Sequence, residues 1–221
     1  MKERPILFSG PMVRAILDGR KTQTRRVVKP QPYIDEMDNF VWNGWNFGQN
    51  ARGVPHIQAL ASPVPWNKTK RVLCPYGAPG DRLWVRETWN FANTAIGSAR
   101  EEDGPFTYAT YPAYPTIDGK WKPSIHMPRY ASRLSLEITN VHIERLQGIS
   151  EADAAAEGVE SLRSEGEFWK DYLRSTARCD ELICLNARDS FWTLWDSLNA
   201  ARGFGWEKNP WAWVVEFRRA F

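Results

Sequence analysis

The sequence predicts an α+β fold, a single domain built around a small, mostly antiparallel β-barrel with peripheral helices. Two observations support this prediction. The predicted elements follow the order β-α-β, then a β-rich stretch, then α-α-β, without the regular βαβ alternation of parallel sheets. The clearest single pattern, at residues 134–146, alternates apolar and polar residues almost throughout, which is typical of a half-buried strand.

The first 30 residues predict a strand, a helix and a second strand. The apolar run at 5–9 indicates a short buried strand. Pro11 follows at a first-turn position of a helix, where its missing N–H costs nothing, and apolar residues recur at helical spacing over 12–17. Gly19 stands where a helix C-terminal glycine is expected, and residues 27–28 complete the second strand.

Turn and alternation signals predict the remaining strands. Residues 79–81 (Pro-Gly-Asp) are a turn signal that leads into an alternating strand at 82–89. A shorter strand is expected at 106–110. After the long strand at 134–146, an aromatic strand at 213–217 closes the chain.

Two further helices are predicted from their caps. Residues 150–153 form a capping box that opens a short helix, which runs through three alanines to Glu157 and closes at Gly158. Asn186 caps a longer helix with an apolar stripe at i, i+3, i+4 and i+7, a pattern that more often packs in a core than forms a binding surface. The stripe consists of Phe191, Leu194, Trp195 and Leu198.

Two long segments, at about 31–77 and 160–185, are large insertions in the single domain of residues 1–221. The first is rich in Pro, Gly, Asn and Trp and lacks sustained periodicity, so we expect it to be partly ordered. The second is expected to be partly helical around 168–173. Loops of this length are uncommon unless they are functional or mobile.

The composition excludes several classes of protein. Of the 221 residues, 43% are hydrophobic and 25% charged, which argues against bulk disorder. No segment approaches the roughly 20 apolar residues that span a membrane, and the apolar run before Gly10 is too short for a signal peptide. We therefore expect a cytoplasmic protein without a membrane partner. The three histidines and three cysteines do not show zinc-type spacing, so no metal is expected. The cysteines Cys74, Cys179 and Cys184 do not suggest a disulfide framework either.

The charge is unevenly distributed. The net charge is +3, but residues 1–30 hold eight basic and two acidic side chains, which leaves −3 for residues 31–221. Such a patch attracts phosphate or carboxylate ligands, although a solvated basic face has the same composition. Tryptophan contributes 12 residues, which can build a core, stack on nucleobases or bind protein partners.

Lys21 and Thr24 are the first candidates for catalysis. A threonine hydroxyl is a weak nucleophile until a base removes its proton, and a lysine can be that base if desolvation or nearby cations lower its pKa. Arg20, Arg25 and Arg26 are the nearby cations. In a regular strand, residues 21 and 24 point to opposite faces, so they converge only if the chain bends after the preceding helix. The alternative is a solvated lysine and an ordinary strand threonine, and neither side chain is predicted to be in the core.

Glu157 is the second candidate. A carboxylate near a helix C-terminus is electrostatically unfavourable, and the alanines before it leave room for a bulky group. This suggests a cationic partner or a substrate amine. The alternative is an exposed surface glutamate.

Four segments resemble the ASCH domain of the PUA-like superfamily. Residues 19–26 (Gly-Arg-Lys-Thr-Gln-Thr-Arg-Arg) look like its signature, and residues 79–85 (Pro-Gly-Asp-Arg-Leu-Trp-Val) resemble its Gly-Asp strand entry. Residues 149–159 are similar to its acidic helix, and the closing aromatic strand also fits. The resemblance covers residues 5–30, 78–90, 134–160 and 187–221, and the whole chain is similar to Trp-rich ASCH proteins encoded by phages or prophages.

The resemblance implies an activity and a set of site residues. Compact bacterial ASCH enzymes are amidohydrolases that remove the acetyl group from 4-acetylcytidine without a cofactor. Their threonine nucleophile, activating lysine and assisting glutamate match Thr24, Lys21 and Glu157, which should therefore line a common cavity at the barrel mouth. The substrate-binding residues expected beside them, for phosphate or carbonyl groups and for base stacking, are Arg25, Arg26, Arg86 and Trp89.

Two other functions remain open from the sequence. Some ASCH proteins are thought to bind or cut RNA, so the chain is alternatively a non-catalytic module for RNA or for modified or single-stranded DNA, with or without nuclease activity. A third interpretation is a module that docks a phage or host protein through Trp42, Trp45 and Trp66 in the first insertion.

Overall fold

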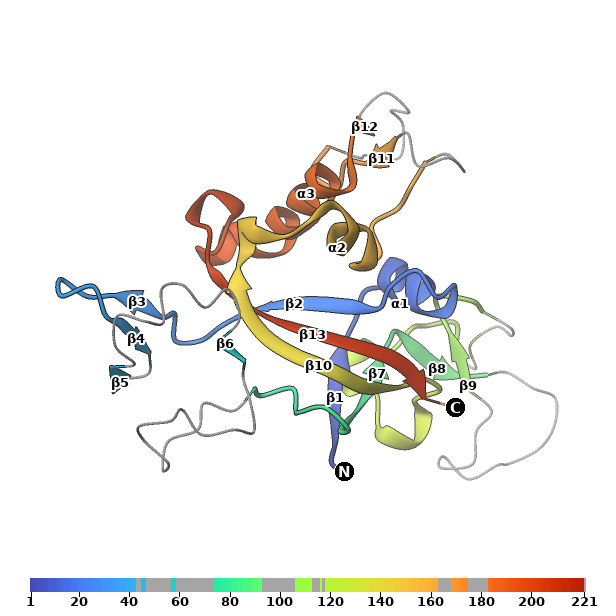
Figure 1. The fold of residues 1–221 in the computed structure, drawn as a ribbon. Helices are drawn as coiled ribbons and strands as arrows, with labels where there is room; N and C mark the ends of the chain where they lie inside the picture. Colours follow the sequence, from blue (N-terminus) through green and yellow to red (C-terminus); the bar gives the residue numbers. More distant parts are fainter. Residues whose placement is uncertain are drawn as a thin grey trace.

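The computed structural model describes residues 1–42, 74–92, 106–112, 116, 118–162, 168–174 and 183–220, and the backbone of residues 45–46 and 57–58. The fold is mixed α+β, with few helices and a mostly antiparallel main sheet (Figure 1). The strand order in this sheet is β1-β7-β10-β13-β2, and the two-residue strand β6 (Ile57–Gln58) also pairs with β10. Among the described residues, no helix is long and apolar enough to cross a membrane.

The centre of the main sheet is a long antiparallel pair. Strand β10 (Ser135–Arg145) pairs with β13 (Trp211–Ala220) from one end to the other, with a register shift between Ile138 and Asn140. Strand β2 (Gln23–Val27) pairs with the other side of β13 and forms an edge of the sheet. The alternation at 134–146 therefore predicts the strand on which the sheet is built.

One strand pair departs from the expected antiparallel pattern. Strand β1 (Glu3–Leu7) runs parallel to β7 (Arg82–Arg86), from Glu3 opposite Arg82 to Leu7 opposite Arg86. The alternation of a strand carries no information about the direction of its neighbour, which explains why the sequence did not predict this pair.

The described residues also form three smaller sheets outside the main sheet. Strands β3 (Tyr33–Ile34), β4 (Phe40–Trp42) and β5 (Trp45–Asn46) form one, and β8 (Trp89–Phe91) pairs with β9 (Phe106–Tyr108). Strand β11 (Trp169–Lys170) pairs with β12 (Ile183–Cys184). The prediction of a helix around 168–173 is therefore wrong, because the backbone groups of residues 169 and 170 pair with strand β12 instead.

In the described part of the chain, α1 begins with the proline in its first turn and α2 and α3 begin at their caps, as the sequence predicts. Helix α1 spans Gly10–Leu17, α2 spans Glu151–Ala156 and α3 spans Ala187–Asn199. The backbone N–H of Asp153 donates to the Ser150 hydroxyl at 3.1 Å, and that of Asp189 donates to the Asn186 side chain at 2.7 Å. Short 3-10 helices occupy Ser124–His126, Arg129–Ala131, Leu146–Gly148, Ala200–Arg202 and Trp206–Lys208.

Apolar clusters cover both faces of the β10–β13 pair. On one face, Val13 and Ile16 of α1 belong to a cluster with Trp213 and Val215. On the other face, Phe191 of α3 belongs to a cluster that includes Ala212 and Ala154 of α2. Successive residues of β13 thus face different layers, as the strand geometry requires. Edge strand β2 lies between α1 on one side and the α2–α3 layer on the other (Figure 1).

The start of the first insertion belongs to the core. Phe40 and Trp42 are buried in the cluster beneath α1, and the Trp42 ring lies 5.5 Å from that of Trp213. The Trp42 indole N–H donates to the Pro30 carbonyl at 3.0 Å. Because Trp42 is only 3% exposed, the expectation that it docks a partner protein is wrong. Trp66 and the side chain of Trp45 lie outside the described residues.

Replacing the cap of α3 tests its contribution to stability. Asn186→Ala removes the acceptor for the Asp189 N–H and should lower the free energy of unfolding by about 1 kcal/mol, measured by chemical denaturation. Asn186→Ser, which keeps an acceptor oxygen, should recover most of the loss. Equal destabilisation by both variants would contradict the capping role.

Candidate active site

The link between α1 and β2 determines where Lys21 lies. Gly19 has a φ of +75°, and its N–H donates to the Ile16 carbonyl at 3.1 Å. The N–H groups of Arg20 and Lys21 both donate to the Ala15 carbonyl at 2.9 Å. This is the Schellman arrangement, which ends a helix and turns the chain sharply. The chain therefore bends after Gly19, and Lys21 precedes the regular strand that holds Thr24.

The bend directs Lys21 toward the end of α2. Its ammonium donates to the backbone carbonyl of Glu157 at 2.6 Å and to the Glu157 carboxylate at 3.0 Å. The backbone adds a further bond, since the Thr22 N–H donates to the Ala156 carbonyl at 2.9 Å. A cation at a helix C-terminus interacts favourably with the unpaired carbonyls there. Lys21 thus compensates the unfavourable position of the carboxylate.

Arg25 is the second partner of Glu157. One guanidinium nitrogen lies 3.1 Å from the Glu157 carboxylate, and the Arg25 Nε donates to Glu144 at 2.7 Å. The three side chains Lys21, Arg25 and Glu157 are at most 5% exposed. The alternative of an exposed surface glutamate is therefore wrong. The Arg25 guanidinium is committed to carboxylates, so its role is to position Glu157 rather than to hold a free anion.

Burial is the main cause that lowers the pKa of Lys21. The charged ammonium is disfavoured away from water, and the positive charges of Arg26 and Arg25 lower the pKa further. The contact with Glu157 opposes this shift without reversing it. Arg20 instead pairs with Asp18 at 3.2 Å on the surface. The expectation that Lys21 and Thr24 lie outside the core is wrong, since each is 4% exposed.

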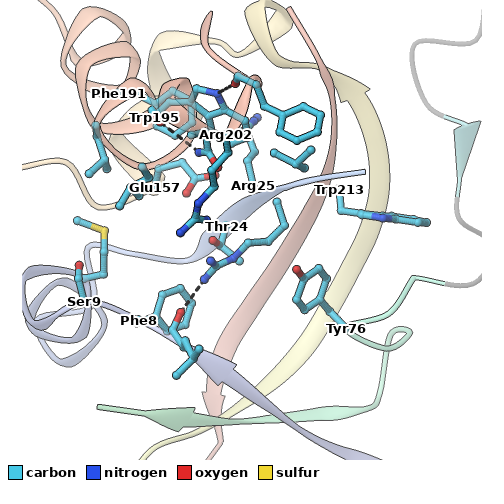
Figure 2. Close-up of a pocket in the computed structure, with 18 of the residues that line it drawn as sticks. Phe8, Ser9, Thr24, Arg25, Tyr76, Glu157, Phe191, Trp195, Arg202 and Trp213 are labelled. Atoms are coloured by element: carbon cyan, nitrogen blue, oxygen red, sulfur yellow. Dashed lines mark hydrogen bonds and ion pairs between the residues drawn. The ribbon is translucent and has the colours of Figure 1, made fainter. Parts of the chain in front are cut away.

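A cavity of about 640 Å³ opens along the free edge of β2 (Figure 2). Lys21, Thr24 and Glu157 all line it, as the resemblance implies, together with Arg25 and Arg26. Its volume is in the usual range for small-molecule sites. Among the groups that the structure describes, the Thr24 hydroxyl has no hydrogen-bond partner, so it is free to bind a ligand.

Two of the expected substrate-binding residues are not part of this cavity. Trp89 is 3% exposed and packs against Met127 and Ala131, so no ring face is available to stack on a base. Arg86 of β7 lies with its guanidinium 4.6 Å from the Trp84 ring and donates to the Ile125 carbonyl at 3.3 Å. The stacking role of Trp89 is therefore wrong, and the structure does not bring Arg86 to the cavity.

Several cavity residues were not predicted as site residues from the sequence. The apolar stripe of α3 faces the cavity, although the sequence favoured a core role. Phe191 and Trp195 are buried in the core and also line the cavity, whereas Leu198 lines the cavity and is 53% exposed. Tyr76, which Figure 2 shows opposite this helix, comes from the end of the first insertion. Only the α3 stripe carried a signal in the sequence, its helical spacing.

No protein-family model, curated protein or solved structure matches the chain. Within the described part of the chain, no group of three or more His, Cys, Asp or Glu side chains could hold a metal ion.

Gly158 permits the close approach of α2 to Lys21. Its φ is +85°, and a Cβ there would lie 2.8 Å from the Lys21 Cβ and 2.9 Å from the Ala15 Cβ. Gly158→Ala should lower the free energy of unfolding by about 1–2 kcal/mol through backbone strain and by a further 1–3 kcal/mol, approximately, through overpacking.

The control for this variant is Gly119→Ala. Gly119 has a similar φ of +69° but no atom within 4 Å of the added Cβ, so only the strain term is expected. Chemical denaturation measures both variants. Equal losses of unfolding free energy in the two variants would show that the contact of residue 158 with Lys21 and Ala15 is not tight.

Proposed function

We propose that the chain is a PUA-like ASCH protein, its sheet curled into the family's β-barrel, that removes an acyl group from the exocyclic amine of a cytosine-type base. The observation that carries the proposal is the buried ion pair between Lys21 and Glu157 in the same cavity as the Thr24 hydroxyl. A desolvated lysine with a lowered pKa, in the same cavity as an uncommitted hydroxyl, is one of the arrangements that can activate a nucleophile.

The proposed reaction has two stages. In the first, the Thr24 oxygen attacks the acyl carbon while its proton passes to the neutral Lys21 amine. The carbon–nitrogen bond then breaks, the base nitrogen receives a proton, and the acyl group remains on Thr24 as an ester. In the second, water attacks the ester, and the carboxylic acid leaves as the Thr24 hydroxyl is restored.

Glu157 accepts the proton from Lys21 and passes it to the leaving amine in this scheme. Its carboxylate is 3.0 Å from the Lys21 nitrogen, which is within direct proton-transfer reach. Arg25 donates to the other oxygen of this carboxylate, and the Arg25 guanidinium is itself held by Glu144. Neither step requires a metal or an organic cofactor.

A binding module without turnover is the second candidate. It is favoured by one observation, the lack of a hydrogen bond between the Thr24 hydroxyl and Lys21 in the described structure. In enzymes without substrate such bonds are often long and form only in the reactive complex. Turnover by the wild-type protein would favour the enzyme, and its absence would favour the binding module.

Thr24 variants test the nucleophile. Thr24→Val keeps the side-chain shape but removes the hydroxyl, and it should lower hydrolysis of 4-acetylcytidine by a hundredfold to ten-thousandfold, approximately. Thr24→Ser should retain measurable activity, and Thr22→Val, at an exposed neighbouring threonine, should have no effect. Release of cytidine, followed by chromatography, measures all four proteins. No release by the wild type at any pH would favour the binding module.

The pH dependence tests Lys21 as the base. The neutral amine is the active form, so kcat should rise with pH through the pKa of Lys21 and then level off. Because burial lowers this pKa, the rise should be centred below the ordinary lysine value of about 10.4. A rate that does not rise with pH in this range would exclude Lys21 as the base.

A further inference from the structure

The charges that line the cavity are unbalanced. Among the described lining residues, the cationic side chains are Lys21, Arg25, Arg26, Lys29 and Arg202, and the single carboxylate is Glu157. Lys21 and Arg25 are both bound to this carboxylate. In the described part of the chain, the other three cations have no carboxylate within ion-pair distance. Three positive charges therefore face one cavity with no counter-ion among the described side chains.

Arg26 is the innermost of these three cations. It lies on the same face of β2 as Thr24, two residues further along the strand. One of its terminal nitrogens donates to the Leu7 carbonyl at 2.7 Å, and the guanidinium lies 5.3 Å from the Phe8 ring. Its Nε is buried and has no hydrogen-bond partner among the described groups. A buried guanidinium donor without a partner favours a ligand acceptor at this place.

Lys29 and Arg202 are at the outer part of the same cavity. Arg202 ends the 3-10 helix that follows α3, just before Gly203, which turns the chain with a φ of +82°. Figure 2 shows Arg202 on the α3 side of the cavity that holds Thr24. The Lys29 ammonium lies 5.3 Å from the Phe204 ring. Arg202 is close enough to Arg26 that its charge lowers the pKa of Arg26, in addition to the effect of burial.

We propose that Arg26, Lys29 and Arg202 form a phosphoryl-binding subsite, so that the cavity takes a nucleotide whose phosphate is bound beside the acylated base. The identity of that base rests on the proposed function, whereas the anion subsite does not. Guanidinium groups match the geometry of phosphate oxygens and make strong charge-assisted hydrogen bonds with them. The separation of Thr24 and Arg26 along β2, roughly 7 Å, leaves room for a sugar between the base and the phosphate.

Calorimetric titration tests the subsite without any need for turnover. The wild type should bind cytidine 5′-monophosphate about tenfold to a hundredfold more tightly than cytidine, the range expected for hydrogen bonds to a charged group. Arg202→Gln should remove most of this difference and leave cytidine affinity unchanged. Arg202 is exposed, so the variant should fold. Lys208→Gln, at an exposed lysine outside the cavity, is the control for general charge loss.

Three further titrations complete the experiment. Lys29→Gln should weaken cytidine 5′-monophosphate binding in the same direction as Arg202→Gln. Inorganic phosphate should compete with cytidine 5′-monophosphate but not with cytidine. A cytosine trinucleotide without terminal phosphates distinguishes the two possible sources of the bound phosphate. If it binds more tightly than cytidine 5′-monophosphate and this binding depends on Arg202, the subsite takes a phosphodiester of a nucleic acid rather than a free nucleotide.

Equal affinity of the wild type for cytidine and cytidine 5′-monophosphate, with no preference for the trinucleotide, would overturn the subsite even if acetylcytidine is hydrolysed. Equal losses of affinity for cytidine 5′-monophosphate in Arg202→Gln and Lys208→Gln would also overturn the subsite. Conversely, an Arg202-dependent preference for phosphate in a protein that hydrolyses nothing would support the subsite while the proposed function fails.

Discussion

The contact of Lys21 with both the backbone carbonyl and the carboxylate of Glu157 is the constraint on which the candidate site depends. It joins the end of α1 to the end of α2, two helices that pack on different faces of the main sheet. Strand β2 starts two residues after this contact, so the same junction sets where Thr24 lies. A change at either helix end would therefore displace the proposed nucleophile and the proposed base together.

Burying this ion pair has a large desolvation cost, which the surroundings offset. Breaking a buried pair by removal of one partner typically costs about 3–5 kcal/mol, whereas a complete pair contributes little net stability. Here Arg25 bonds the same carboxylate, and the Phe8 ring lies 5.4 Å from the Lys21 nitrogen. The arrangement keeps the lysine away from water, and it is this desolvation that lowers its pKa. Water exclusion thus links the packing to the proposed chemistry.

The sequence predicts the features that depend on neighbours along the chain. The caps at Ser150 and Asn186, the turn at Gly19 and the alternation of β10 are local signals, and the structure confirms each of these elements. The parallel β1–β7 pair and the β11 strand depend on partners far away in the chain, which periodicity does not encode. For the same reason the sequence offered Trp89 as a stacking residue, although it is buried, and gave no signal for Arg202, which tertiary packing alone brings to the cavity.

The protonation of Lys21 is the most direct test of this account. Nuclear magnetic resonance of protein carrying isotope-labelled lysine can follow its side chain as a function of pH, with Lys21→Met to assign the signal. We expect a midpoint below the ordinary lysine value of about 10.4, because desolvation outweighs the attraction of Glu157. A midpoint at or above that value would contradict the account, since Lys21 would then be a permanently charged structural partner of Glu157 and not a base for Thr24.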